Sequence, residues 1–206
     1  EGKTNPRVGR SYLSGFLFAF TPDAVKNALD MGLLKLHPPE QSPKSVAIEL
    51  VRSKSISNRM LILRALSESW FPITNLSAAK DTVQLQSALE QSQLPTINTG
   101  EGGTSYRFMA AYLASNGYEG VLTASGKMLD RPIRSLVDAL NQLGAGIQYL
   151  QKEGYPPLAY HGHQLKGVHV SLRGDISSQF ITALMMIAPT LSEGLRIQLT
   201  TPLTSK

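Results

Sequence analysis

The apolar and polar positions of the chain repeat in one order: a short aliphatic run, a small polar loop and an amphipathic segment. The aliphatic runs are rich in β-branched residues and predict strands at 45–51, 121–124, 146–150, 168–172 and 195–199. Segments with apolar residues three or four positions apart predict helices at 57–68, 81–91, 104–117, from about 130 to 143, and 177–187. Strands that alternate with helices predict an α/β fold built from repeated strand–helix units.

Local signals refine several of these helices. The helix at 57–68 has apolar residues on most faces, which predicts deep burial. Asp81 and Gln84 form a capping-box pattern, and Gly117 is a suitable residue to end the third helix. The fourth helix has Pro132 in its first turn and Gly144 past its end. Its predicted inner face consists of Ile133, Leu136, Val137, Leu140 and Leu143.

Residues 1–44 differ in composition and are interpreted as an unassigned N-terminal extension and linker. Thr21 and Pro22 are suited to begin a helix that runs to about Leu34, and the proline-rich segment 37–43 predicts a linker. The apolar stretch 12–20 is too short to span a bilayer. We therefore expect a protein of the cytoplasm without a membrane partner, with residues 45–206 as its folded part.

The charge balance indicates anionic partners. The chain has 20 Lys and Arg against 15 Asp and Glu, for a formal net charge of +5. The cations are dispersed and not interleaved with aromatic residues, so we do not expect a nucleic-acid partner. The chain has no cysteine, which excludes disulfides, zinc–thiolate sites and a cysteine nucleophile.

The densest polar cluster is SKSISNR at 53–59, directly before an apolar run. If Lys54 and Ser55 end a strand and the helix begins near Ser57, the cluster lies at a helix N-terminus, where free N–H groups and the dipole attract anions. Arg59 adds a planar guanidinium suited to a carboxylate. The simpler explanation is an ordinary N-cap with two solvated cations.

Three further predicted helix starts carry similar chemistry. Adjacent glycines at 102 and 103 allow a close backbone approach to a ligand, although such a pair is commonly only a turn. Arg131 follows a capping aspartate, and on its own is a surface arginine. Ser177, Ser178 and Gln179 offer two hydroxyls and an amide, or simply an N-cap. Because polar and cationic residues recur at four predicted helix N-termini, we expect these N-termini to converge on one cleft.

The motifs SKSISNR, GGT followed by Arg107, DRPI, YPPL and SSQF occur in an order and spacing that resemble the 5-enolpyruvylshikimate-3-phosphate synthase family. The resemblance covers residues 45–206. It implies one lobe of the two-lobed enolpyruvyl transferase fold, an inside-out α/β barrel, with its third repeat incomplete. It also implies transfer of the enolpyruvyl group of phosphoenolpyruvate to the 5-hydroxyl of shikimate 3-phosphate, with release of phosphate and without a metal or organic cofactor.

The resemblance also assigns residue roles. Lys54 is expected to contact phosphoenolpyruvate near the reacting hydroxyl, and Ser55 and Arg59 to hold the shikimate carboxylate. The Gly103 backbone and Arg131 are expected to bind phosphoenolpyruvate. The residues expected at the 3-phosphate are Ser177, Ser178 and Ser205, with Gln179 between the two ligands. The C-terminal lobe is the expected partner, the complete enzyme is expected to be a monomer, and this chain alone is expected to be an inactive half.

Some residues depart from the family pattern. Val51 and Arg52 replace the usual lead into Ser53, and Phe108 stands where some members have proline, which bears on the response to glyphosate. Two alternatives remain open. One is the sister transferase that acts on UDP-N-acetylglucosamine, which typically has asparagine after the lysine and often a catalytic cysteine. The other is a non-catalytic anion- or nucleic-acid-binding module on the same fold.

Overall fold

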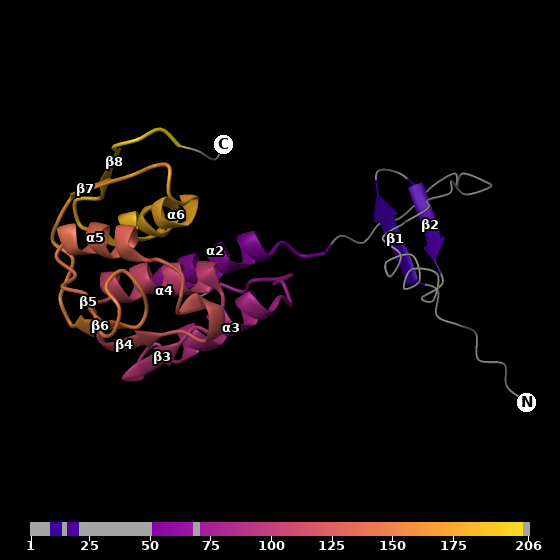
Figure 1. The fold of residues 1–206 in the computed structure, drawn as a ribbon, viewed down its shortest axis with the longest axis horizontal. Helices are drawn as coiled ribbons and strands as arrows, with labels where there is room; N and C mark the ends of the chain where they lie inside the picture. The colour runs from indigo at the N-terminus through magenta and orange to yellow at the C-terminus, as the bar shows by residue number, and fades with distance from the viewer. Residues whose placement is uncertain (1–8, 14–15, 21–50, 68–70, 204–206) are drawn as a thin grey trace, which may run out of the picture. The chain divides into compact units, whose positions relative to one another are not determined.

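The chain divides into two compact units, Glu1–Leu50 and Val51–Lys206 (Figure 1). The computed structural model describes residues 9–13, 16–20, 51–67 and 71–203. In the first unit, β1 (Gly9–Leu13) pairs antiparallel with β2 (Phe16–Phe20), with Gly9 opposite Phe20.

Some expectations concern residues outside that described part. The helix expected over 21–34 and nearly all of the strand expected over 45–51 are among them, and so is Ser205. Val51 is described and belongs to no strand. The interpretation of residues 1–44 as an extension and linker stays a prediction.

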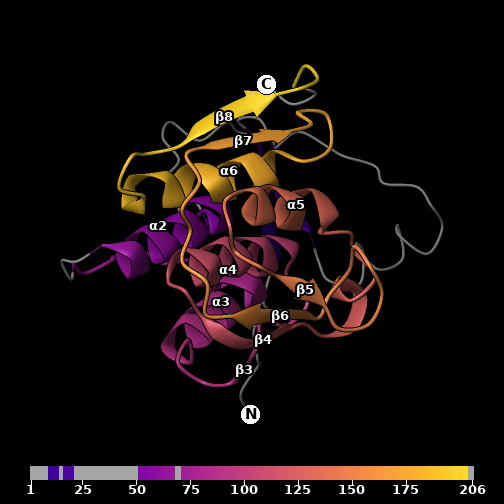
Figure 2. The same ribbon diagram turned by 90° about the vertical axis from the view of Figure 1, so that its left-hand side faces the viewer.

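The second unit has helices between two sheets, as Figures 1 and 2 show from two directions. The larger sheet has the order β3 (Thr96–Asn98), β4 (Glu119–Thr123), β6 (Leu158–His161), β5 (Gln148–Tyr149). Only the β3–β4 pair in this sheet is parallel. The second sheet pairs β7 (His169–Leu172) in parallel with β8 (Arg196–Leu199). The predicted α/β class is confirmed, with strands β3 and β6 in addition to those expected.

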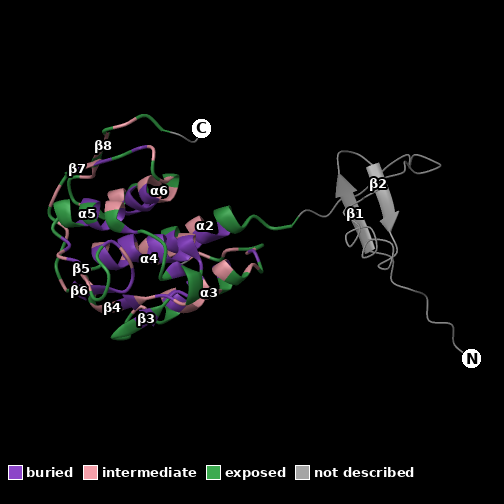
Figure 3. Cartoon of the chain, in the orientation of Figure 1, coloured by how far each residue is buried: buried purple, intermediate pink, exposed green. Residues whose placement is uncertain are grey.

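Helix α4 (Gly103–Ser115) occupies the centre of this unit. It contacts the other described α-helices of the unit, namely α2 (Lys54–Leu66), α3 (Lys80–Glu90), α5 (Arg134–Gln142) and α6 (Ser178–Ile187). Ten of its 13 residues are buried, and Figure 3 shows it in the buried colour along most of its length. A helix that is covered on nearly every side fixes the position of its first turn closely.

The prediction of deep burial was wrong for α2. This helix buries one face, while Ile56 is 64% exposed and Leu63 is 40% exposed.

The predicted termini of two other helices were partly right. Gly117 ends α4 as predicted, with φ of 60° and the Tyr118 N–H donating to the Leu113 carbonyl at 3.0 Å. The predicted capping box was wrong, because Ala79 is the N-cap of α3 and makes no side-chain cap hydrogen bond.

The predicted inner face of the fourth helix is confirmed. Its residues are all buried: Ile133, Leu136, Val137, Leu140 and Leu143. Helix α5 packs this face between α4 and β7, which it contacts. No helix in the described part of the chain is both long and apolar enough to cross a bilayer.

Candidate functional site

Helix α2 begins at Lys54, earlier than the predicted start near Ser57. The reason is Ser53, whose hydroxyl accepts a hydrogen bond from the Ile56 N–H at 3.3 Å and caps the helix. Lys54 and Ser55 therefore lie in the first turn, not at the end of a strand. This turn contains no acidic residue. A lysine at the positive end of a helix is unfavourable by itself, so its presence points to an anion partner.

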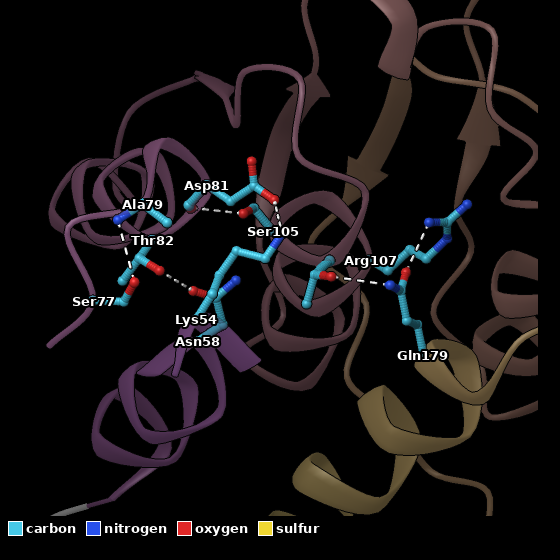
Figure 4. A network of polar contacts seen from close by, with 10 residues as sticks. Lys54, Asn58, Ser77, Ala79, Asp81, Thr82, Ser105, Arg107 and Gln179 are labelled. Carbon is cyan, nitrogen blue, oxygen red and sulfur yellow. Dashed lines mark hydrogen bonds and ion pairs between the residues drawn. The ribbon is translucent and has the colours of Figure 1, made fainter. Parts of the chain in front are cut away.

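Lys54 reaches across to the neighbouring helix. Its Nζ lies 3.0 Å from Oδ2 of Asp81, which is in the first turn of α3 (Figure 4). The Asp81 backbone carbonyl accepts a hydrogen bond from the Ser105 hydroxyl of α4 at 2.8 Å. Fully buried Asn58 accepts from the Thr82 hydroxyl at 2.8 Å and holds α3 against α2. These contacts join the N-terminal turns of α2, α3 and α4.

Arg59 and Ser55 are joined directly by hydrogen bonds. Nη1 of Arg59 donates to the Ser55 carbonyl at 3.0 Å and also to its hydroxyl. Nη2 reaches the Thr182 hydroxyl of α6 at 3.5 Å. The guanidinium lies 5.5 Å from the ring centroid of Phe108, so this ring supports the arginine.

Two guanidinium groups meet at Gly103, the first residue of α4. A Cβ atom added there would lie 2.7 Å from Nη1 of Arg107 and 2.9 Å from Nη1 of Arg131. The N-cap, Gly102, supplies no side chain to the first amide groups of the helix. Burial lowers the pKa of Arg107 below its ordinary value, and the nearby charge of Arg131 lowers it further.

Arg131 reaches this position from a turn and not from a helix start, which corrects the prediction. Helix α5 begins only at Arg134, with Ile133 as its N-cap. The Ile133 N–H donates to the Gly154 carbonyl at 2.8 Å, and this bond holds the chain out of the helix up to that point. The carbonyl of Pro132 accepts from Nη2 of Arg107 at 3.1 Å, so the turn is tied to α4.

The start of α6 completes the group. Ser177 is the N-cap, and its hydroxyl accepts from the Gln179 N–H at 3.3 Å, so capping is one of its functions. Ser178 is exposed. The Gln179 side chain bridges to α4: its Oε1 accepts from Nη1 of Arg107 at 2.8 Å, and its Nε2 donates to the Thr104 hydroxyl at 3.0 Å.

The structure therefore brings the described candidates together through a continuous series of contacts. The predicted site residues in the described part are Lys54, Ser55, Arg59, Gly103, Arg131, Ser177, Ser178 and Gln179. Helices α2, α4 and α6 have no acidic residue in their first turns. Four side-chain cations, Lys54, Arg59, Arg107 and Arg131, lie at or near these positive ends, and Lys54 pairs with the carboxylate of Asp81. This arrangement attracts small anions with several negative charges.

A surface hollow at the other ends of these helices does not share this chemistry. It has a volume of about 510 Å³ and lies at the C-terminal ends of α2, α4 and α6. No charged side chain is among the described residues that line it. The hydroxyls of Ser115 and Thr190 there donate to helix carbonyls at 2.8 Å. The N-terminal ends therefore carry the candidate site for anions.

Comparison with a family profile gives a match that lies within the second unit. The sequence profile of the family described as EPSP synthase (3-phosphoshikimate 1-carboxyvinyltransferase) matches residues 84–206, which is more than half of the chain. The chain belongs to the EPSP synthase family. The matched EPSP synthase region contains Gly103, Arg131 and the start of α6, whereas α2 lies before it.

Curated relatives cover α2 as well. A 3-phosphoshikimate 1-carboxyvinyltransferase of Bacteroides fragilis (strain YCH46) is 43% identical over 159 residues, covering 77% of this chain and 38% of the relative. One of Shewanella pealeana is 36% identical over 201 residues, covering 85% of this chain and 47% of the relative. The chain thus spans less than half the length of these EPSP synthase relatives and corresponds to their N-terminal part.

The fold agrees with solved structures of the same family. A 2.37 Å structure of EPSP synthase from Acinetobacter baumannii matches with a TM-score of 0.67 at 20% sequence identity. The match covers 77% of this chain and 41% of that chain. The structure therefore has the fold of one lobe of EPSP synthase.

Two members of this network, Arg107 and Asp81, were not among the predicted site residues. Arg107 was part of a family motif, and its position four residues after Gly103 places both on one helix face, which was a usable signal. Asp81 had no such signal, because its partner Lys54 is distant in sequence and only the packing of α3 on α2 brings them together.

Proposed function

We propose that the chain is the N-terminal lobe of an enzyme that transfers the enolpyruvyl group of phosphoenolpyruvate to the 5-hydroxyl of shikimate 3-phosphate. In this reaction the hydroxyl oxygen loses its proton and bonds to C2 of phosphoenolpyruvate while a proton adds to C3, which breaks the C2–C3 double bond and gives a tetrahedral adduct. Phosphate then leaves C2 as C3 loses a proton, and the double bond of the enolpyruvyl group forms again. The observation that supports it is the meeting of Arg107 and Arg131 at Gly103, beside Lys54, at helix ends without acidic first turns.

Two anionic substrates repel each other, so the enzyme must hold them in place against that repulsion. Gly103 and Arg131 are proposed to bind phosphoenolpyruvate, with the α4 amides directed at its phosphate. Lys54 is proposed to lie between this substrate and the reacting hydroxyl, where a cation stabilises the charge that develops. Alignment of the two reactants provides the rest of the rate enhancement from this lobe.

The other substrate is proposed to lie nearer α6. The paired Ser55 and Arg59 hold the shikimate carboxylate, since a guanidinium fixed against Phe108 presents a planar donor edge. Ser177, Ser178 and Ser205 bind the 3-phosphate, and Gln179 contacts both ligands. The site is completed by a C-terminal lobe, and we propose that the chain alone is inactive, that the complete enzyme is a monomer in the cytoplasm, and that it needs no metal or organic cofactor.

A binding and turnover experiment tests this function. Shikimate 3-phosphate and a short DNA duplex are titrated into the chain at two salt concentrations, and phosphate release is measured when the C-terminal lobe is present. We expect binding of the sugar phosphate and turnover that a chelator does not abolish. Binding of the duplex alone, with a steep salt dependence, would instead identify a nucleic-acid-binding module. Turnover with UDP-N-acetylglucosamine only would identify the sister transferase.

A further inference from the structure

Arg107 is the most buried charged side chain among the described site residues. It is 9% exposed, and its guanidinium lies 5.1 Å from the ring centroid of Phe180. Its two terminal nitrogens donate to two different segments, to Gln179 Oε1 at 2.8 Å and to the Pro132 carbonyl at 3.1 Å. Figure 4 shows the first of these contacts between α4 and α6.

The contact with Arg107 fixes the orientation of the Gln179 amide. A guanidinium only donates hydrogen bonds, so the oxygen of the amide must face Arg107. The amide nitrogen then faces α4 and donates to the Thr104 hydroxyl at 3.0 Å. An amide nitrogen has two hydrogens, and one remains for an acceptor in the site. Without Arg107, the two ends of the amide could exchange places.

The second contact fixes a distance. Arg131 directly precedes Pro132, whose carbonyl is held by the same guanidinium that holds Gln179. One rigid planar group therefore sets the separation between the Arg131 turn and the first turn of α6. A lysine could not reproduce this, because its ammonium is a single point on a flexible stem.

Stability alone does not explain a buried arginine of this kind. Arg107 makes no ion pair with any described residue, and its buried Nε has no hydrogen-bond partner. A buried charge without a carboxylate partner is costly, and an apolar side chain of similar volume would avoid the cost. An unpaired buried charge, which ordinary packing would avoid, is expected at positions where function requires it.

We infer that Arg107 is a positioning residue that orients the Gln179 amide and holds it in register with Arg131. The inference rests on the proposed function, because it assigns Gln179 and Arg131 to the two substrates. Arg107 itself acts through these two residues and does not contact the reacting atoms.

A double-mutant cycle in the complete enzyme, with its C-terminal lobe, tests this. The variants are Arg107→Lys, Gln179→Ala and both together, with Arg134→Lys as the control on an exposed arginine paired with Glu153. We expect Arg107→Lys to lower kcat about tenfold, since hydrogen bonds to charged groups are worth that much or more. Both KM values should change less than about threefold, and the double variant should equal Gln179→Ala within about twofold.

The outcomes separate the alternatives. Additive losses of kcat would overturn the inference, because Arg107 would then act independently of Gln179. Coupling in thermal unfolding with an unchanged kcat would also overturn it, because the role would be purely structural. If Arg107→Lys does not fold, Arg107→Met takes its place in the same cycle. Absence of turnover in the unsubstituted enzyme would instead refute the proposed function.

Discussion

The first turns of α2 and α4 contribute to one site in opposite ways. Helix α2 is capped by the Ser53 side chain and presents Lys54, whose side chain is 50% exposed and can move in water. Helix α4 has no side-chain cap and presents the buried backbone of Gly103, flanked by the fixed guanidinium of Arg107. One helix supplies an adjustable charge, and the other supplies a rigid surface.

This difference predicts how substitutions divide between activity and stability. An exposed ion pair such as Lys54–Asp81 contributes about 0–1 kcal/mol to folding, so its loss leaves the fold intact. A change at Gly103 disturbs buried groups that other elements hold in place, so stability and binding should change together.

Lys54→Ala should abolish most activity with little loss of stability. In the complete enzyme we expect kcat to fall about 100-fold or more, because a cation near developing charge is removed. The melting temperature should change by only a few degrees. The matched control is Lys80→Ala, an exposed lysine near Glu101, which should leave kcat unchanged. Near-normal turnover of Lys54→Ala would refute its assigned role.

Gly103→Ala should affect both properties. The new methyl group would lie 2.7 Å from Arg107 Nη1 and 2.9 Å from Arg131 Nη1, so it would displace Arg131, the proposed phosphoenolpyruvate ligand, as well as Arg107. We expect KM for phosphoenolpyruvate to rise about tenfold and the free energy of unfolding to fall by about 1–3 kcal/mol. Steady-state kinetics measure KM, and denaturant unfolding measures the free energy of unfolding. Gly194→Ala, where no atom lies within 4 Å of the added Cβ, is the control for KM. Unchanged kinetics for Gly103→Ala would contradict the rigid-surface interpretation of α4.

Arg59→Ala tests whether Arg59 serves only the shikimate 3-phosphate side of the site. We expect KM for shikimate 3-phosphate to rise about tenfold, because a charge-assisted contact with its carboxylate is lost, while KM for phosphoenolpyruvate stays within about twofold. Arg64→Ala, near the C-terminal end of the same helix, is the matched control and should alter neither KM. An unchanged KM for shikimate 3-phosphate would count against the carboxylate assignment.

Ser53→Ala should have the smallest effect on activity. Its capping bond is 3.3 Å long, so we expect a loss of about 0.5–1 kcal/mol in the free energy of unfolding and unchanged KM values. Chemical denaturation and kinetics check the two expectations. A rise in KM comparable to that of Arg59→Ala would mean that the cap, and not only the side chains after it, sets the geometry of the site.

Much of the second unit could be predicted from local patterns. The inner face of α5 follows from apolar spacing, and the end of α4 follows from the positive φ that Gly117 supplies. Strand β3 has three residues, too few for a periodic pattern, and β6 follows two prolines that indicate a turn. The burial of α2 was overestimated because an apolar side chain such as Ile56 can remain exposed.

The grouping of the site could be predicted, but its internal contacts could not. Family motifs and polar helix starts identified the residues, and their roles toward the substrates stay predictions. The start of α2 was misplaced because Ser53, Ser55 and Ser57 are equally good caps by sequence. The turn that contains Arg131 depends on a hydrogen bond from the Ile133 N–H to the Gly154 carbonyl. The residues around Ile133 do not predict a partner so distant in sequence.

The paired guanidinium groups at Gly103 have a practical consequence for measurements on this protein. Sulfate and inorganic phosphate in common laboratory buffers carry the charge and the tetrahedral oxygen arrangement that such a pair attracts. These ions will compete with any natural ligand and will raise the apparent melting temperature by mass action. Titrations should therefore be carried out in chloride solutions free of sulfate and phosphate.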